Sequence, residues 1–286
     1  MTVRPRGSSA GRLPRSQAPG EARGPMQIPV AIRPWFDLAK CLDRLADDLL
    51  VGCAPSQDDS RTFVIAVLFL QVHKSFGGSL LLAERGLPGD ANAVLRGAAE
   101  AAIALHALEA DPDFTKRLIG DHFSRHRKQA GVFIRNSDYT RELDQVDHSR
   151  LERTEKRADA SEHGFDGELR EIRWDQVAEK YCCPDLYNLI YRPLSTLGTH
   201  VNPRRMDMNL KTDEHGAILG LNRGPTTEGL DLTLQSACMI LLLAARVAAD
   251  LLGQRGFEDR LRFQTRRLEE LADQDRRRGI SCDTPQ

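Results

Sequence analysis

The sequence predicts an all-α protein, a multi-helix bundle with one small β-hairpin at about residues 206–223 packed on it. Apolar residues recur at helical spacing in successive segments of the chain, and prolines or glycines stand between these segments. Only the hairpin region alternates apolar and polar residues as strands do. The chain has 286 residues, 41% hydrophobic and 28% charged, which is enough to bury one sizeable core.

The first four helices follow from this periodicity. A helix with Pro34 in its first turn is expected at residues 34–50, and a long, largely apolar helix runs from residue 61 to about residue 84. The third helix, residues 91–110, is apolar on nearly every face, which is typical of a helix in the middle of a bundle. A fourth helix is expected at residues 111–134, with Phe114 on its inward side.

The later elements are shorter and more varied. Short helices are expected at residues 174–181 and from Pro184 to about His200. The hairpin turns at the tetrapeptide DEHG, which ends in glycine. A long buried helix through Leu252 and a charged amphipathic helix at residues 257–273 complete the expected bundle.

The domain organisation is expected to be simple. Residues 1–27 are rich in Arg, Gly and Pro and predict a disordered tail, with translation starting at Met1 or at Met26. Residues 28–286 are expected to form a single helical-bundle domain. Within it, dense alternating charge at about residues 138–172 predicts an exposed charged helix and a flexible loop.

Charge and cysteine content narrow the class of protein. The formal net charge is −1, so no global basic field favours nucleic acid. Six cysteines form no CxxC pair, and the adjacent Cys182 and Cys183 cannot form a normal disulfide, so a reducing cytoplasm is expected. The two most apolar stretches, residues 63–70 and 237–245, are shorter than the roughly 20 residues of a bilayer-spanning helix, so no membrane span is expected.

No metal or cofactor is expected. His122 and His126 are four residues apart, a spacing that can place two imidazoles on one metal. However, the chain has neither HExxH nor ExxH at this point, and several basic residues crowd the same turn and would repel a cation. These are Arg125, Arg127 and Lys128. A solvated basic helix face is expected instead.

Arg96 and Glu100 are four residues apart on the apolar third helix, so they can form an ion pair on one face of it. Their apolar neighbours predict that the pair is buried. Two interpretations stay open, because such a pair can specify the packing of the bundle, or a carboxylate can hold an arginine at the floor of an anion-binding pocket.

The stretch YRPLSTLGTH holds the other candidate residues. Tyr187, Tyr191 and Ser195 follow at four-residue steps and share a helical stripe, while Pro193 predicts a kink. In a regular helix His200 would lie about 140° round from Ser195. If Gly198 ended the helix, the His200 imidazole could turn towards Ser195, Tyr191 or the Arg96–Glu100 pair.

Two kinds of catalysis are compatible with these residues. A Ser195–His200 nucleophile and base would need about 3 Å between them and an oxyanion hole, and the sequence has no GxSxG elbow. The Arg192 to His200 stretch resembles helical ribonucleases of the HEPN class, in which a histidine acts as acid or base on a ribose hydroxyl. That class has four to six residues between an arginine and this histidine, and commonly Asn, Asp or His directly after the arginine. Here seven residues separate Arg192 from His200, and Pro193 follows Arg192.

Residues 95–108, Trp174 and residues 187–200 together resemble an uncharacterised, mostly bacterial all-helical family, the domain of unknown function fifty-six seventy-seven. Its members have an Arg-x-x-x-Glu pair on an apolar helix, then Tyr-x-x-x-Tyr, a Leu-Ser step and a later histidine. The match covers roughly residues 60–225. The resemblance implies a helical bundle and a shared polar cluster, and it implies no established activity. The cluster comprises Arg96, Glu100, Tyr191, Ser195 and His200.

Three functions follow from these observations. The leading hypothesis is a cytoplasmic protein of unknown biochemical role with a polar pocket in its bundle. The second is a HEPN-like, metal-independent ribonuclease of a defence or toxin system, and only this one requires RNA. The third is an interaction module that binds a partner protein or forms a homodimer. The candidate catalytic residues are Tyr191, Ser195 and His200, and the candidate binding residues are Arg96, Glu100 and Arg192.

Overall fold

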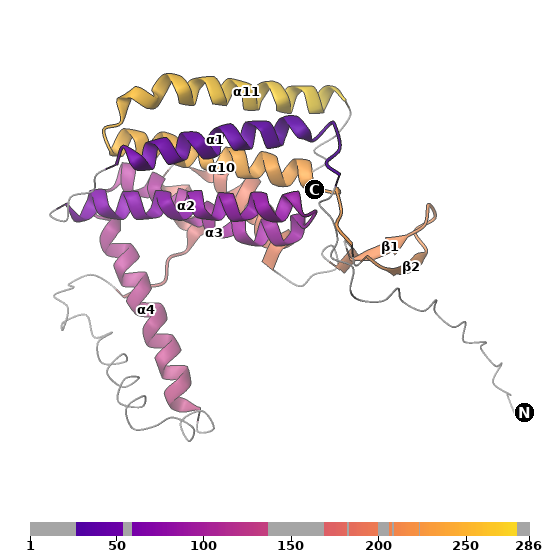
Figure 1. The fold of residues 1–286 in the computed structure, drawn as a ribbon. Helices are drawn as coiled ribbons and strands as arrows, with labels where there is room; N and C mark the ends of the chain where they lie inside the picture. The colour runs from indigo at the N-terminus through magenta and orange to yellow at the C-terminus, as the bar shows by residue number, and fades with distance from the viewer. Residues whose placement is uncertain are drawn as a thin grey trace, which may run out of the picture.

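The computed structural model of the chain describes residues 27–53, 59–136, 169–181, 183–199, 206–207, 209–222 and 224–278. Helices dominate these residues, and one two-stranded hairpin accompanies them (Figure 1). The all-α class with one hairpin is therefore confirmed. The expected tail, most of the charged segment at 138–172, and His200 lie outside the described residues.

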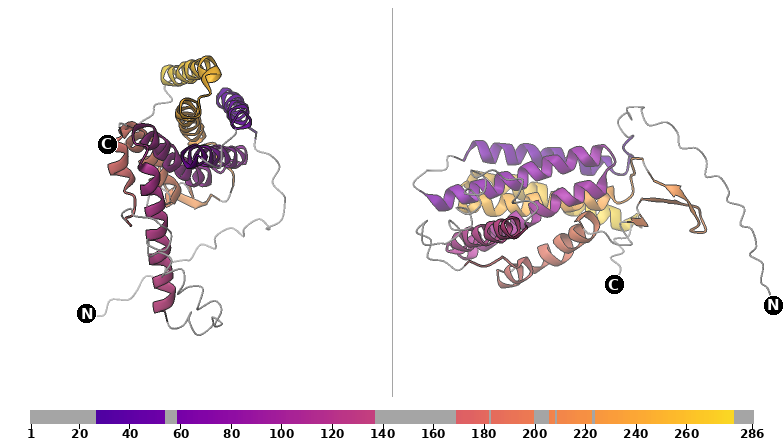
Figure 2. Two further views of the ribbon diagram at one scale, coloured as in Figure 1. Left: turned by 90° about the vertical axis from the view of Figure 1, so that its left-hand side faces the viewer. Right: turned by 90° about the horizontal axis from the view of Figure 1, so that it is seen from below.

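Five long helices form the body of the molecule. They are α1 (Arg33–Val51), α2 (Ser60–Glu84), α3 (Pro88–Ala110), α10 (Leu230–Leu251) and α11 (Glu258–Arg277). Helices α2, α3 and α10 pack against one another, α1 lies against α10 and α2, and α11 covers α1 and α10. Seen nearly end on, α11 lies on the outside of this group (Figure 2, left).

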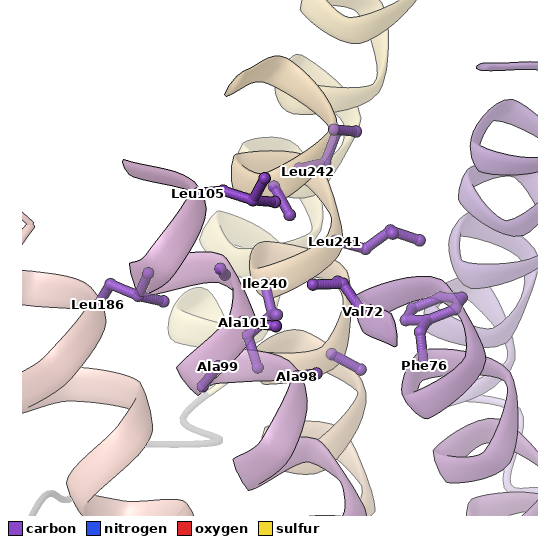
Figure 3. Close-up of a cluster of buried hydrophobic side chains, with 14 of the residues drawn as sticks. Val72, Phe76, Ala98, Ala99, Ala101, Leu105, Leu186, Ile240, Leu241 and Leu242 are labelled. Atoms are coloured by element: carbon purple, nitrogen blue, oxygen red, sulfur yellow. The ribbon is translucent and has the colours of Figure 1, made fainter. Parts of the chain in front are cut away.

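The core lies where α2, α3 and α10 meet. Alanines of α3 and large apolar residues of α2 and α10 interlock there, and Leu186 closes the cluster from the other side of α3 (Figure 3). Small residues let α3 approach its neighbours closely, which suits its central place in the bundle. The labelled side chains include Val72, Phe76, Ala98, Ala101, Leu105, Ile240 and Leu241.

Helix α4 (Phe114–Arg135) leaves the body at a steep angle (Figures 1 and 2). Phe114 anchors its first turn, because this side chain is fully buried and meets the Tyr181 ring edge to face at 5.6 Å. Tyr181 directly follows the short helix α7 (Trp174–Lys180) and donates a hydrogen bond to Asp111 Oδ2 at 2.7 Å. The predicted inward position of Phe114 is therefore confirmed.

The hairpin consists of β1 (Leu210–Thr212) and β2 (Ile218–Leu221), paired antiparallel. Asp213 organises its turn by accepting backbone N–H hydrogen bonds from His215 and Ala217. One detail differs from expectation: the hairpin extends from the end of the bundle, and the β2 side chains on both of its faces are exposed (Figure 1). The strands are short, so they cover little of the helical surface.

Among the described residues, α2 and α10 are long and apolar enough to cross a membrane by length and composition alone. Core helices of soluble proteins pass the same test. In α10, 67% of the most apolar window is buried in the bundle, whereas in α2 only 33% is. Helix α10 is thus a core helix, and α2 keeps an apolar side exposed.

Candidate functional site

The helix that carries the tyrosines is irregular. It consists of a π-helical turn η2 (Leu186–Tyr191), a short α-helical piece α8 (Arg192–Leu194) and a second π-helical turn η3 (Ser195–Thr199). The Arg192 N–H donates to the Tyr187 carbonyl, five residues back, as in π-helices. Pro193 has no N–H to donate, and a π-helical turn lies on each side of the short α-helical piece that contains it.

Gly198 lies inside η3 and does not end the helix, which corrects one of the two alternatives drawn from the sequence. Its φ is not positive, as a left-handed C-terminal glycine would require. A Cβ at this position would lie 2.4 Å from the Ala93 backbone nitrogen of α3. Glycine is needed because the two backbones touch.

This contact aligns η2 with one face of α3, and three polar side chains meet there. Arg96 Nη2 lies 3.1 Å from Glu100 Oε1, so the pair forms the ion pair that its spacing predicts. The Tyr191 hydroxyl accepts a hydrogen bond from Arg96 Nη2 at 2.9 Å and donates one to Glu100 Oε1 at 3.0 Å. The result is a closed triangle of one cation, one anion and one neutral hydroxyl.

The triangle is half-open to solvent. The side chains of Arg96 and Glu100 are 35% and 28% exposed, whereas Tyr191 is only 8% exposed. The predicted burial of the pair is therefore only partial, because η2 covers only one side of it. Two cavities lined by described residues, of about 420 and 350 Å³, lie elsewhere, between α1 and α11 and beside the start of α10.

Tyr191 is the most buried member of the triangle, and burial raises the pKa of its phenol above the ordinary value of 10. The hydrogen bond from Arg96 lowers this pKa, and the Glu100 carboxylate raises it. The phenol is consequently neutral near pH 7 and keeps the proton that it donates to Glu100.

A stack of rings and guanidinium groups continues outward from the triangle. The Arg96 guanidinium lies over the Tyr191 ring at 5.3 Å, and Tyr191 stacks on Tyr187 with ring centroids 5.0 Å apart. The Arg192 guanidinium covers Tyr187 at 5.8 Å and makes a long, 3.4 Å hydrogen bond to Asn188. Of the carboxylates that the structure describes, none lies within ion-pair distance of Arg192.

Two buried polar atoms on the same side of α3 have no partner among the described residues, Arg96 Nε and Asn92 Oδ1. Asn92 is 5% exposed and lies one helical turn before Arg96, next to the Gly198 contact. A buried donor and a buried acceptor without partners are costly. Arg96 Nε can therefore donate a hydrogen bond to water or to a bound molecule, and Asn92 Oδ1 can accept one from either.

The other predicted residues are placed as follows. Ser195 is partly buried at the start of η3, four residues after Tyr191. His200 lies outside the described residues, so the pairing of Ser195 with His200 stays a prediction. The His122 and His126 rings are 4.3 Å apart on α4, and the neighbouring Asp121 is already bound by Arg125.

One cluster was missed in the sequence. His73 of α2 lies between two carboxylates of α1, with Nε2 2.8 Å from Asp43 and Nδ1 3.7 Å from Asp47. The potential ligand atoms of the three residues lie within 4.8 Å of one another. The i, i+4 spacing of the aspartates was a usable signal, but the partner histidine lies on another helix. Both ring nitrogens already face a carboxylate, so His73 joins α2 to α1 through these contacts.

The fold and this site define a helical-bundle protein in which an Arg–Glu pair on a central helix is joined by a tyrosine from a π-helical segment. The chain belongs to a family described as "Family of unknown function (DUF5677)", whose model matches residues 62–217. This range includes the Arg96–Glu100–Tyr191 triangle. No curated protein and no solved structure matches the chain.

Proposed function

We propose that the surface formed by Arg192, Tyr187 and the Arg96–Glu100–Tyr191 triangle binds an anionic ligand that carries a phosphate group. The observation that carries this proposal is the exposed Arg192 guanidinium, which has no carboxylate partner among the described residues. Arginine presents a planar set of donors that matches phosphate oxygens. Glu100 neutralises Arg96, so Arg192 supplies the attracting charge and Arg96 supplies a further donor.

The proposal is tested by isothermal titration calorimetry, in which the full chain is titrated with inorganic phosphate and, separately, with a dinucleotide. Arg192→Ala should abolish binding, and Arg192→Lys should weaken it, because lysine keeps the charge and loses the planar fork. Arg262→Ala is the matched control, since Arg262 is an exposed helical arginine that is paired with Glu258. Equal affinities of wild type and Arg192→Ala would exclude this surface.

A second candidate is a metal-independent ribonuclease that uses Arg192 and His200. The π turn favours it, because an α turn takes 3.6 residues and a π turn about one residue more, so one turn of each takes up about eight. The step from Arg192 to His200 is eight residues in the sequence, one more than the longest step of the HEPN pattern, and η3 lies within it. The other candidate catalytic residues, Tyr191 and Ser195, lie on the same irregular helix as Arg192.

The ribonuclease candidate is tested with purified protein and single-stranded RNA in the presence of a metal chelator. Cleavage by the wild type is expected, and His200→Ala should abolish it while leaving the circular dichroism spectrum unchanged. Intact RNA after incubation with the wild type would contradict this candidate without touching phosphate binding. A negative result for one of the two proposals therefore leaves the other unaffected.

We also propose that the protein works in the cytoplasm of a bacterium. Three described cysteines, Cys41, Cys53 and Cys238, are free thiols, as expected of a reducing compartment. Fractionation of cells that produce the tagged full chain tests this proposal, and recovery from the membrane or secreted fraction would contradict it.

A further inference from the structure

Helix α2 exposes an apolar stripe along the side that faces away from the core. The stripe, here called the α2 stripe, comprises Phe63, Val67, Leu70, Lys74, Gly77 and Leu81. Phe63 is 52% exposed and Leu81 67% exposed. Single exposed apolar residues are common, but four in one row indicate an interaction surface; Lys74 and Gly77 lie in this row between Leu70 and Leu81.

The spacing of the α2 stripe is that of a coiled-coil seam. Its residues follow one another at steps of 4, 3, 4, 3 and 4 positions, the a/d pattern of a heptad repeat. The other apolar face of α2, with Phe69 and Phe76, is buried against α3 and α10. Helix α2 is therefore apolar on two sides, and the structure uses one of them.

We propose that the α2 stripe binds the same stripe of a second copy of this chain, with the two α2 helices antiparallel. A twofold axis near residue 72 sets Phe63 opposite Leu81 of the other copy and Val67 opposite Gly77. A large residue then meets a small one, and a Cβ built at Gly77 meets nothing within 4 Å, so the partner side chain has room.

Lys74 decides the orientation. In a parallel pair in register, Lys74 would face its own copy, and like charges opposed in a seam are unfavourable. In the antiparallel pair Lys74 lies against Leu70, so that its aliphatic stem covers the leucine and its ammonium reaches water. The pattern is thus complementary to itself in one orientation only, which is why a second copy is the occupant.

The predicted dimer is reversible. The stripe spans 18 helical steps, about 27 Å at 1.5 Å per residue. One helix pair of this length covers less than the roughly 800 Å² per partner of a standard stable interface. Dimerisation should therefore depend on protein concentration. This inference is independent of the phosphate site.

A matched pair of phenylalanines tests the surface. Phe63 on α2 and Phe263 on α11 are both helical and are 52% and 53% exposed. Sedimentation equilibrium of the full chain should show a dimer for the wild type and for Phe263→Glu. Phe63→Glu should raise the dissociation constant by about tenfold or more, because its charge would be buried without a partner. A wild type that stays monomeric over the whole concentration series would overturn the proposal.

A charge swap tests the orientation. Leu70→Lys alone should give a monomer, because the new lysine faces Lys74 of the other copy. The double variant Leu70→Lys/Lys74→Glu should dimerise again, because each new lysine faces a new glutamate in the antiparallel pair. A double variant that stays monomeric would refute the antiparallel register. Wild-type protein that sediments with phosphatidylcholine vesicles as a monomer would assign the stripe to a lipid surface and overturn the dimer.

Discussion

At the scale of single residues, Tyr191 is the residue on which the polar cluster depends. Its hydroxyl is the only neutral member of the Arg96–Glu100–Tyr191 triangle, and it both accepts from the arginine and donates to the carboxylate. The charges of Arg96 and Glu100 offset each other, so η2 can cover the pair without burying a net charge. The phenol thereby links η2 to α3.

The raised pKa of Tyr191 predicts a loss of stability at alkaline pH. An acid whose pKa rises on folding stabilises the native state fully below the unfolded value, about 10 for tyrosine, and loses this contribution as the pH rises through the folded pKa. Above about pH 10, the unfolding temperature of the wild type should therefore fall more steeply than that of Tyr191→Phe.

Thermal unfolding followed by circular dichroism at several pH values measures this difference. Tyr187→Phe is the control, because Tyr187 stacks on the same ring and its variant should keep the wild-type slope. Equal slopes for wild type and Tyr191→Phe would show that the phenol ionises as freely in the folded as in the unfolded chain.

At the scale of elements, the regular helices were predictable and the π-helical segment was not. Periodicity located α1 to α4, α10 and α11, because apolar residues three and four apart mark the buried side of an α-helix. The same pattern carries no sign of a turn closed by hydrogen bonds five residues apart. Spacing also predicted the contact of Arg96 with Glu100, but the share of each side chain left exposed depends on η2, which is far away in the sequence.

The role of Gly198 is a second feature that the local sequence pattern could not predict. A glycine near a helix end favours termination by local rules, yet its actual role is set by the Ala93 backbone on another helix. Whether a glycine ends a helix or admits a neighbour cannot be decided from the sequence around it. In the described residues η3 continues through Gly198 to Thr199, so the alternative in which the helix ends at Gly198 is not seen there.

Gly198→Ala should destabilise the fold. The added Cβ would lie less than 3 Å from backbone atoms of Asn92 and Ala93, which cannot move aside as a flexible side chain would. Overpacking of this kind costs about 1–3 kcal/mol. Urea unfolding should show a lower midpoint with an unchanged slope.

Gly97→Ala is the control for this variant. Gly97 lies inside α3, and a Cβ there meets nothing within 4 Å. Replacing a helical glycine by alanine at such a site stabilises by about 0.4–1 kcal/mol. If the two variants shifted the midpoint in the same direction, the backbone contact between η3 and α3 would be disproved.

At the scale of the whole molecule, α10 ties the bundle together. It packs against α1, α2, α3 and α11, and its buried residues belong to the same hydrophobic cluster as theirs. The peripheral parts are attached at few points, since α4 leaves the body and the hairpin extends from its end (Figure 1). Local opening should thus begin in these peripheral parts, and the five long helices should unfold together.

The thiol of Cys238 on α10 should report this shared unfolding. It is completely buried, and burial raises its pKa far above the ordinary value, so the native thiol is neither accessible nor ionised. Cys41 on α1 is only partly buried and should react with an alkylating reagent in the native state. Mass spectrometry of a labelling time course in urea separates the two cysteines. The labelling free energy of Cys238 should equal the global free energy of unfolding, with the same urea dependence. Labelling of Cys238 at urea concentrations where the bundle is still folded would mean that α10 opens on its own, and that the five helices do not share one cooperative core.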